Sequence, residues 1–158
     1  MQKKKLWIPI VVGILIAEGV GALSALLSGG FGNQYTTLEQ PPLAPPAWVF
    51  PVAWTILYAM MGAASGLIWA KAGRTPKGQN ALTLYAVQLT LNFSWSIIFF
   101  RFELLGLSVA VILLLTLMVI WTTLAFYRIK PLAGYLMIPY IIWLVFASYL
   151  NIGVLILN

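Results

Sequence analysis

Five long apolar segments, separated by short polar or glycine- and proline-rich connections, fill almost the whole chain. Each is longer than the ~18 residues above which an apolar run indicates a membrane-spanning helix rather than a buried core helix. We predict spans at about residues 6–27, 48–70, 82–100, 105–126 and 132–157. Only helices or closed barrels satisfy the backbone inside a bilayer, and these runs lack the two-residue alternation of a barrel strand. The pattern predicts an all-α membrane protein, a five-transmembrane-helix bundle that forms a single domain over residues 1–158.

The positive charges predict how this bundle is oriented. The chain has nine Lys and Arg residues and three acidic residues, for a net charge of +6. Eight of the nine basic residues fall on one side of the predicted membrane: Lys3, Lys4, Lys5, Lys71, Arg74, Lys77, Arg128 and Lys130. They are scattered through short connections, which argues against a nucleic-acid partner. By the positive-inside rule we expect a multi-pass protein of the cell membrane, with a cytoplasmic N-terminus and an external C-terminus.

The first apolar run follows three lysines, an arrangement that it shares with secretory signal peptides. The run over residues 6–27 is longer than the roughly 7–15 apolar residues of a signal peptide. We therefore interpret it as the first span.

Proline and glycine mark the connections. The longest connection, residues 28–47, ends in an extended, proline-rich segment that contains Pro41, Pro42, Pro45 and Pro46. Pro46 is expected in the first turn of the second helix, whereas Pro51 and Pro139 are expected inside helices that kink or locally unwind there. The polar loop at residues 71–80 and the turn at residues 102–104 are short, so successive helices should be antiparallel neighbours.

The missing residue types exclude several kinds of chemistry. The chain has no cysteine and no histidine, so it offers no disulfide, no thiolate nucleophile, no zinc site of the usual kinds and no His-ligated haem iron. Glu18, Glu39 and Glu103 are too scattered in sequence for an acid/base pair to be proposed. We expect no metal and no resident cofactor.

Three predicted helix faces combine aromatic rings with hydrogen-bonding side chains at helical spacing. The first face has Trp54, Tyr58, Met61 and Ser65; the second has Tyr85, Gln88, Asn92, Trp95 or Ser96, and Phe99; the third has Tyr140, Trp143, Ala147, and Leu150 or Asn151. Amides are costly to leave facing lipid, so these faces should point into the bundle. They either line a ligand pocket or supply core packing and hydrogen bonds between helices.

Two further features have both a structural and a functional interpretation. Glu18 is the acidic residue deepest within a span, and it is either a ligand or proton site or a neutral carboxyl bonded to a neighbouring helix. The small residues from Gly62 to Gly66 permit a close helix approach, within one chain or between two.

Three sequence blocks resemble the translocator protein family, also called TspO/MBR or peripheral benzodiazepine receptor. They are PPLAPPAWVFPVAWTILYAMM from Pro41, QLTLNFSWSIIFF from Gln88 and PYIIWLVFASYLN from Pro139. The blocks occur in the family's order and spacing. The resemblance implies a five-helix bundle, usually a homodimer, that binds porphyrins such as protoporphyrin IX under the first loop. It also implies that the same pocket binds synthetic isoquinoline-carboxamide or benzodiazepine-type ligands.

The resemblance also implies individual roles. The pocket tryptophans of the family fall on Trp95 and Trp143, its asparagine on Asn92, and the second-helix pair on Trp54 and Tyr58. The proline-rich segment would act as a lid, and Ala147 and Leu150 would face the ligand. No basic residue follows Tyr149, which argues against the sterol motif of mammalian members at that position.

We therefore expect a membrane receptor or carrier that binds a tetrapyrrole between Trp54, Trp95 and Trp143, with Gln88 and Asn92 orienting its polar groups. One alternative is an enzyme that degrades porphyrin in light through the photochemistry of the ligand itself. Another is a transporter of tetrapyrroles or sterols, although no inverted repeat is apparent and five spans do not divide evenly.

Overall fold

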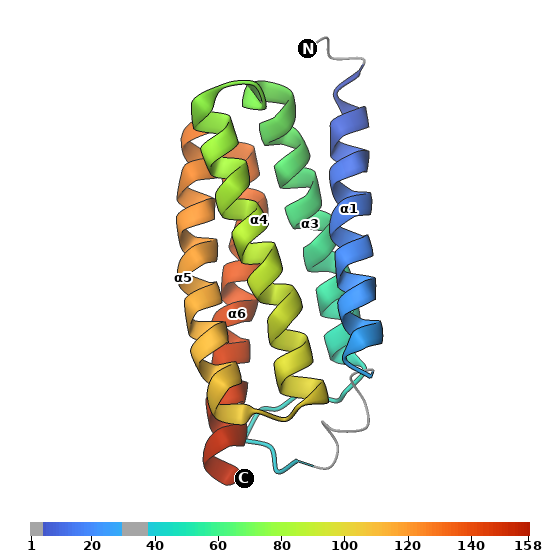
Figure 1. Cartoon of the computed structure of the whole chain (residues 1–158), viewed down its shortest axis with the longest axis vertical. Coiled ribbons are helices and arrows are strands. Elements are labelled where there is room, and N and C mark those ends of the chain that lie inside the picture. The colour runs from blue at the N-terminus through green and yellow to red at the C-terminus, as the bar shows by residue number, and fades with distance from the viewer. Residues whose placement is uncertain (1–4, 30–37) are drawn as a thin grey trace.

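Five long helices make up the bundle in the computed structural model, which describes residues 5–29 and 38–158 (Figure 1). They are α1 (Trp7–Leu27), α3 (Val49–Ala72), α4 (Pro76–Ser96), α5 (Leu105–Ile129) and α6 (Pro131–Leu157). A short π-helix, η2 (Ile97–Arg101), extends α4. All five are long and apolar enough to cross a membrane, α4 together with η2. The predicted all-α class and the five spans are therefore confirmed.

Proline sets where two helices begin. Pro76 and Pro131 occupy the first turns of α4 and α6, where the missing amide hydrogen has no intrahelical partner to lose. At α4 the Thr75 hydroxyl also accepts a hydrogen bond from the backbone N–H of Gly78 at 3.0 Å. The prediction of a polar loop over residues 71–80 was therefore wrong. The α4 helix begins before the apolar part of its sequence, and only residues 73–75 connect α3 to α4.

The proline predictions inside the helices were also partly wrong. Because α3 begins at Val49, Pro46 precedes the helix and Pro51 lies in its first turn, where it replaces an amide that needs no partner. The α6 helix continues through Pro139 without interruption, so the expected local unwinding does not occur. The short turn predicted at residues 102–104 is confirmed, with Glu103 in a left-handed conformation (φ 51°).

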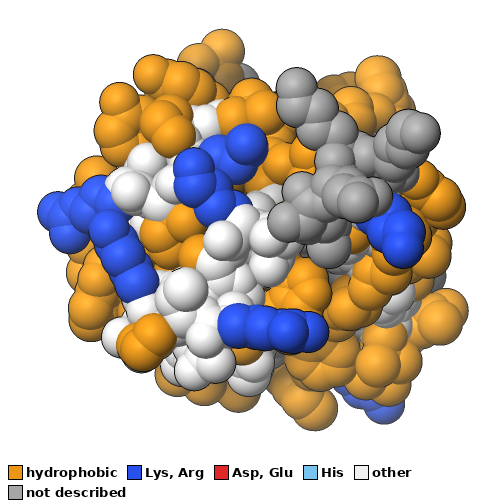
Figure 2. All heavy atoms as spheres, turned by 90° about the horizontal axis from the view of Figure 1, so that it is seen from above, with side chains coloured by type: hydrophobic (Ala, Val, Ile, Leu, Met, Phe, Trp, Pro, Cys, Tyr) orange, Lys and Arg blue, Asp and Glu red, His pale blue; other side chains and the backbone are white. Residues whose placement is uncertain are grey.

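The two ends of the bundle differ in chemistry. We call the end at which α1 begins the basic end; it also has the 73–75 connection and Lys130, the single residue between α5 and α6. Figure 2 looks onto this end and shows lysine and arginine but no acidic side chain. Residues 38–48 and the C-terminus lie at the opposite end, the lid end (Figure 1). The cytoplasmic placement of the basic end stays a prediction, which labelling from either side of the membrane would check; Lys3 and Lys4 lie outside the described residues.

Glycine allows α1 to pack directly against α3. A Cβ added to Gly62 would lie 2.5 Å from the carbonyl oxygen of Gly13, and one added to Gly66 would collide with the carbonyl of Pro9. The small-residue motif from Gly62 to Gly66 is therefore occupied within the chain, which decides between the two interpretations of the sequence. A second copy would have to use another surface.

Replacing Gly62 should separate α1 from α3. We expect Gly62→Ala to lower the free energy of unfolding by about 1–3 kcal/mol, because the backbone of α1 cannot yield to the added methyl group. Gly19→Ala is the matched control, since a Cβ at Gly19 meets nothing within 4 Å. Thermal unfolding in detergent, followed by circular dichroism, measures both variants. Equal stability of the two would contradict the close approach.

Candidate ligand-binding site

The candidate site lies toward the lid end, where α3, α4 and α6 present aromatic side chains to one another. We call Trp54, Tyr58, Trp95, Tyr140 and Trp143 the tryptophan cluster. Trp54 lies at its centre, with ring centroids 6.2 Å from Trp95, 6.1 Å from Tyr140 and 6.2 Å from Trp143. Tyr58, one helical turn along α3, is 5.7 Å from Trp54. The three tryptophans chosen from the sequence are thus brought together.

A chain of side-chain hydrogen bonds runs beside the cluster and links three helices. The Tyr58 hydroxyl of α3 donates to Oδ1 of Asn92 on α4 at 2.8 Å. Nδ2 of Asn92 donates to the Tyr140 hydroxyl of α6 at 2.6 Å, and that hydroxyl donates to Oε1 of Gln88 at 2.8 Å. Both amide side chains are fully buried. The prediction that the polar faces point into the bundle is confirmed, and these amides serve to join helices.

Trp95 belongs to a second polar chain. Its indole Nε1 donates to Oδ1 of Asn151 on α6 at 2.8 Å, and Nδ2 of Asn151 donates to the Ser108 hydroxyl on α5 at 2.9 Å. Ser108 then donates to the carbonyl of Leu105. The indole of Trp95 therefore has a structural partner within the protein.

Trp54 and Trp143 differ from Trp95 in this respect. The indole nitrogens of both are buried and find no hydrogen-bond acceptor in residues 5–29 and 38–158. A buried donor without a partner costs about 1–3 kcal/mol. The tryptophan cluster therefore contains two buried N–H groups that the described residues leave unsatisfied, although both could donate to a ligand.

The other predicted site residues lie around the cluster. Phe99, in η2, stacks on Trp95 at 5.4 Å. Ala147 and Leu150 are buried on α6, one and two turns beyond Trp143. Among the described residues, a cavity of about 140 Å³ borders the cluster and is lined by Glu18, Gly21, Trp54, Thr55, Tyr58 and Ser96.

Glu18 lines that small cavity from α1. It is partly buried and faces Trp54 and Tyr58 across the cavity, and it makes no hydrogen bond or ion pair with any described residue. The interpretation of Glu18 as a carboxyl bonded to a neighbouring helix is therefore not supported. Its position beside the cluster leaves the ligand or proton role open.

The proline-rich segment crosses the lid end and is fastened to α6. Pro41 packs against Gly153, where a Cβ would lie 2.6 Å from the proline ring. The Tyr149 hydroxyl donates to the carbonyl of Pro42, and the side chain of Asn158 exchanges hydrogen bonds with the backbone of Glu39. Pro42 and Pro46 are exposed and Pro45 is half-buried. The segment is therefore held at the C-terminal end of α6, which is the position that a lid requires.

Two aromatic residues of the site were missed from the sequence. Phe50 is buried between Phe100 and Trp143, at 6.3 and 5.9 Å. Phe50 precedes Trp54 by four residues on the same face of α3, so extending the spacing of that face by one turn would have found it. Phe100 follows Ser96 by four residues, so the row from Asn92 through Ser96 would have found it in the same way.

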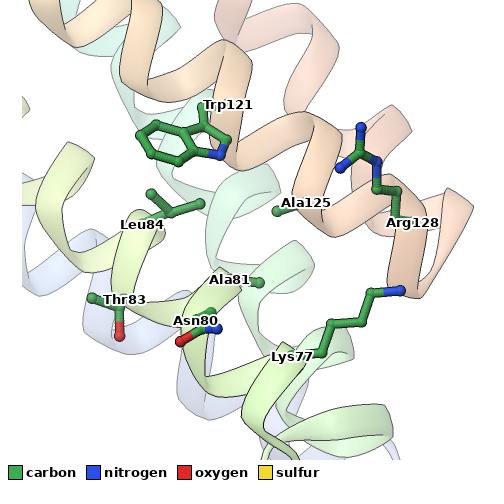
Figure 3. Close-up of a pocket in the computed structure, with 8 residues that line it drawn as sticks. All are labelled: Lys77, Asn80, Ala81, Thr83, Leu84, Trp121, Ala125 and Arg128. Carbon is green, nitrogen blue, oxygen red and sulfur yellow. The ribbon is translucent and has the colours of Figure 1, made fainter.

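Larger hollows lie elsewhere, on the basic end. One of about 470 Å³ lies between α4 and α5, with Trp121 and Leu84 at one end and Lys77 and Arg128 at the other (Figure 3). Trp121 lies on the outside of α5, where 59% of its surface is exposed. This hollow shares no residue with the tryptophan cluster.

Comparison with known proteins agrees with this architecture. Residues 11–157 match the family model described as TspO/MBR family. The chain is 36% identical over its full length to the tryptophan-rich protein TspO of Chlorobaculum tepidum, covering 99% of that protein. It is 36% identical to the human translocator protein over 92% of this chain and 87% of that one. The chain belongs to the TspO/MBR family.

Family membership and the five spanning helices together establish a multi-pass membrane protein. A third relative, the tryptophan-rich sensory protein of Cereibacter sphaeroides, is 39% identical over 78% of this chain and 76% of its own length. The matched residues include all of α3 to α6, so the elements that build the tryptophan cluster are those of a TspO/MBR protein.

Substituting Trp95 and Trp54 in turn should show which indole N–H stabilises the folded protein. Trp95→Phe leaves Oδ1 of Asn151 without its donor, so we expect it to lower the free energy of unfolding by about 1–3 kcal/mol. Trp54→Phe removes a donor that has no acceptor and should cost less, although both changes delete the same atoms. Unfolding of the ligand-free protein in detergent measures the difference. A larger loss in Trp54→Phe would contradict the hydrogen-bond assignment.

Proposed function

We propose that this protein is a membrane receptor or carrier for a flat, amphipathic ligand of the porphyrin class, held against the tryptophan cluster. The observation that carries the proposal is the pair of buried indole N–H groups of Trp54 and Trp143, for which the described part of the chain offers no acceptor. A porphyrin has an extended ring that stacks on indole and carboxylates that accept hydrogen bonds. It would therefore satisfy both the aromatic surface and the unpaired donors.

A porphyrin needs more room than the cavity that the described residues leave beside Trp54. Ligand pockets usually measure about 300–1,000 Å³, whereas the cavity beside Trp54 measures about 140 Å³. The lid segment is a better candidate for the moving part than α1. It is fastened to α6 by a few hydrogen bonds and one proline contact, whereas α1 lies backbone to backbone against α3.

The names of the relatives point to the same class of function. Two relatives are named translocator protein and tryptophan-rich sensory protein, and these names support a membrane transporter or receptor. Isoquinoline-carboxamide or benzodiazepine-type ligands would use the same aromatic surface. A homodimer is also proposed, through a surface other than the occupied Gly62 motif.

Binding of protoporphyrin IX in darkness tests the proposal. We expect Trp54→Phe and Trp143→Phe each to weaken binding by about 1 kcal/mol, roughly fivefold in Kd, through loss of the donor and part of the stacking surface. Trp7→Phe and Trp48→Phe are the controls, because these side chains are 61% and 67% exposed. Tryptophan fluorescence quenching in detergent gives the affinity.

Each outcome of this experiment has a distinct meaning. Equal loss of affinity in the cluster variants and the controls would contradict the assigned site. Absence of saturable quenching in the unsubstituted protein would contradict the porphyrin proposal. Consumption of the ligand in light but not in darkness would favour the enzyme that degrades porphyrin over the receptor.

The lid should control how long the ligand stays bound. Tyr149→Phe removes the hydroxyl that holds the Pro42 carbonyl, a bond worth about 0.5–1.5 kcal/mol. We expect the dissociation rate of protoporphyrin IX to rise about two- to tenfold, with little change in helicity. Stopped-flow fluorescence measures the rate. Tyr135→Phe, at the opposite end of α6 and 56% exposed, is the control, and an equal rise there would leave the lid without support.

A further inference from the structure

Two neighbouring cavities lie at the basic end. The first, about 560 Å³, lies around the connection from α3 to α4 and is lined by Lys5, Lys71 and Arg74; we call it the basic cavity. The second, about 590 Å³, runs along α1 and is lined mainly by apolar side chains; we call it the apolar groove. Lys5 and Trp69 line both, so the charged space and the apolar one lie next to each other.

The apolar groove is about as long as one membrane leaflet is thick. Its lining follows α1 from Lys5 to Ile16. At ~1.5 Å per residue this stretch is about 16 Å long, which is half of the ~30 Å hydrocarbon thickness of a bilayer. Ile8, Val12 and Ile16 line it and are 43%, 48% and 57% exposed. The groove is therefore open toward the bilayer and has the length of a lipid chain that begins at the membrane surface.

The basic cavity has no compensating negative charge among the described residues. Lys5, Lys71 and Arg74 are exposed, and none forms an ion pair with a described carboxylate. Glu39 and Glu103 lie at the lid end, and Glu18 lies in the middle of α1. Figure 2 shows basic side chains and no acidic one on this face. Trp69, 56% exposed where the two cavities meet, is the residue type that prefers the headgroup level of a bilayer.

We propose that the basic cavity and the apolar groove together bind one anionic phospholipid. Its phosphate lies among Lys5, Lys71 and Arg74, and one acyl chain lies along α1 in the groove. The Thr75 hydroxyl already bonds the Gly78 N–H and the Ala72 carbonyl, so the cations and not the helix cap bind the phosphate. The site shares no residue with the tryptophan cluster and does not depend on the porphyrin proposal.

Native mass spectrometry of the purified full chain, with dioleoylphosphatidylglycerol and dioleoylphosphatidylcholine as competing probes, tests this site. Each basic residue near an anionic headgroup contributes appreciably to binding, so we expect the phosphatidylglycerol to be preferred by about tenfold or more. The triple variant Lys5→Gln, Lys71→Gln, Arg74→Gln should abolish the preference. The control variant Lys77→Gln, Arg128→Gln, Lys130→Gln removes the same charge from the same end and should keep it.

A second pair of variants tests the groove without altering charge. Val12→Trp fills the apolar groove and should lower phosphatidylglycerol occupancy about tenfold, to the level of the triple variant. Val11→Trp is the matched control, because Val11 is 40% exposed on the same helix but does not line the groove. Unchanged occupancy in Val12→Trp would overturn the assignment of the acyl chain.

Three other outcomes would also overturn the proposal. Equal binding of the two lipids would show that the cations do not select the headgroup. The control variant at Lys77, Arg128 and Lys130 could lose the preference for phosphatidylglycerol while the first triple variant keeps it. That result would place the lipid in the hollow of Figure 3. Displacement of the lipid by glycerol 3-phosphate at equal concentration would indicate a free phosphate site without a chain.

Discussion

The need to pair every polar side chain inside a bilayer organises the centre of this bundle. With no water in the hydrocarbon region, Asn92 and Gln88 must find partners on neighbouring helices. They do so through Tyr58 and Tyr140, which joins α3, α4 and α6 in one hydrogen-bonded chain. Because each bond has a defined direction, the chain fixes the rotation of these three helices about their axes. Apolar packing alone cannot do this when lipid is as apolar as the core.

The aromatic site follows from that arrangement. Once Tyr58 and Tyr140 are held by the amides, Trp54 and Trp143 lie against each other from facing helices. Trp95 donates its indole N–H to Asn151, whereas the other two indoles have no acceptor among the described residues. The protein thus uses the same residue type for two purposes. One tryptophan joins helices, and two have indole donors without an acceptor among the described residues.

The two ends of the bundle have different chemistry and suit different molecules. At the lid end, a proline contact and backbone hydrogen bonds hold the proline-rich segment against the C-terminal end of α6. At the basic end, cations border an apolar groove that opens to the bilayer. The α1 helix, which packs on α3 through glycine, borders both regions. It lines the small cavity beside Trp54 and also the apolar groove. A movement of α1 would therefore change the shape of both the small cavity and the apolar groove.

The sequence alone determined the five spans, the inward direction of the polar faces and the gathering of basic residues at one end. These properties depend on local hydrophobicity and helical periodicity, which need no knowledge of neighbouring helices. Helix limits near proline were less predictable, as at Pro51 and Pro76, because capping can extend a helix into polar sequence. Only the tertiary structure decided that Asn151, 56 residues from Trp95, takes its N–H while Trp54 has no acceptor. It also decided that Gly62 meets Gly13 within one chain. Both depend on the rotation and register of packed helices, which are set by the whole bundle and by no segment of it.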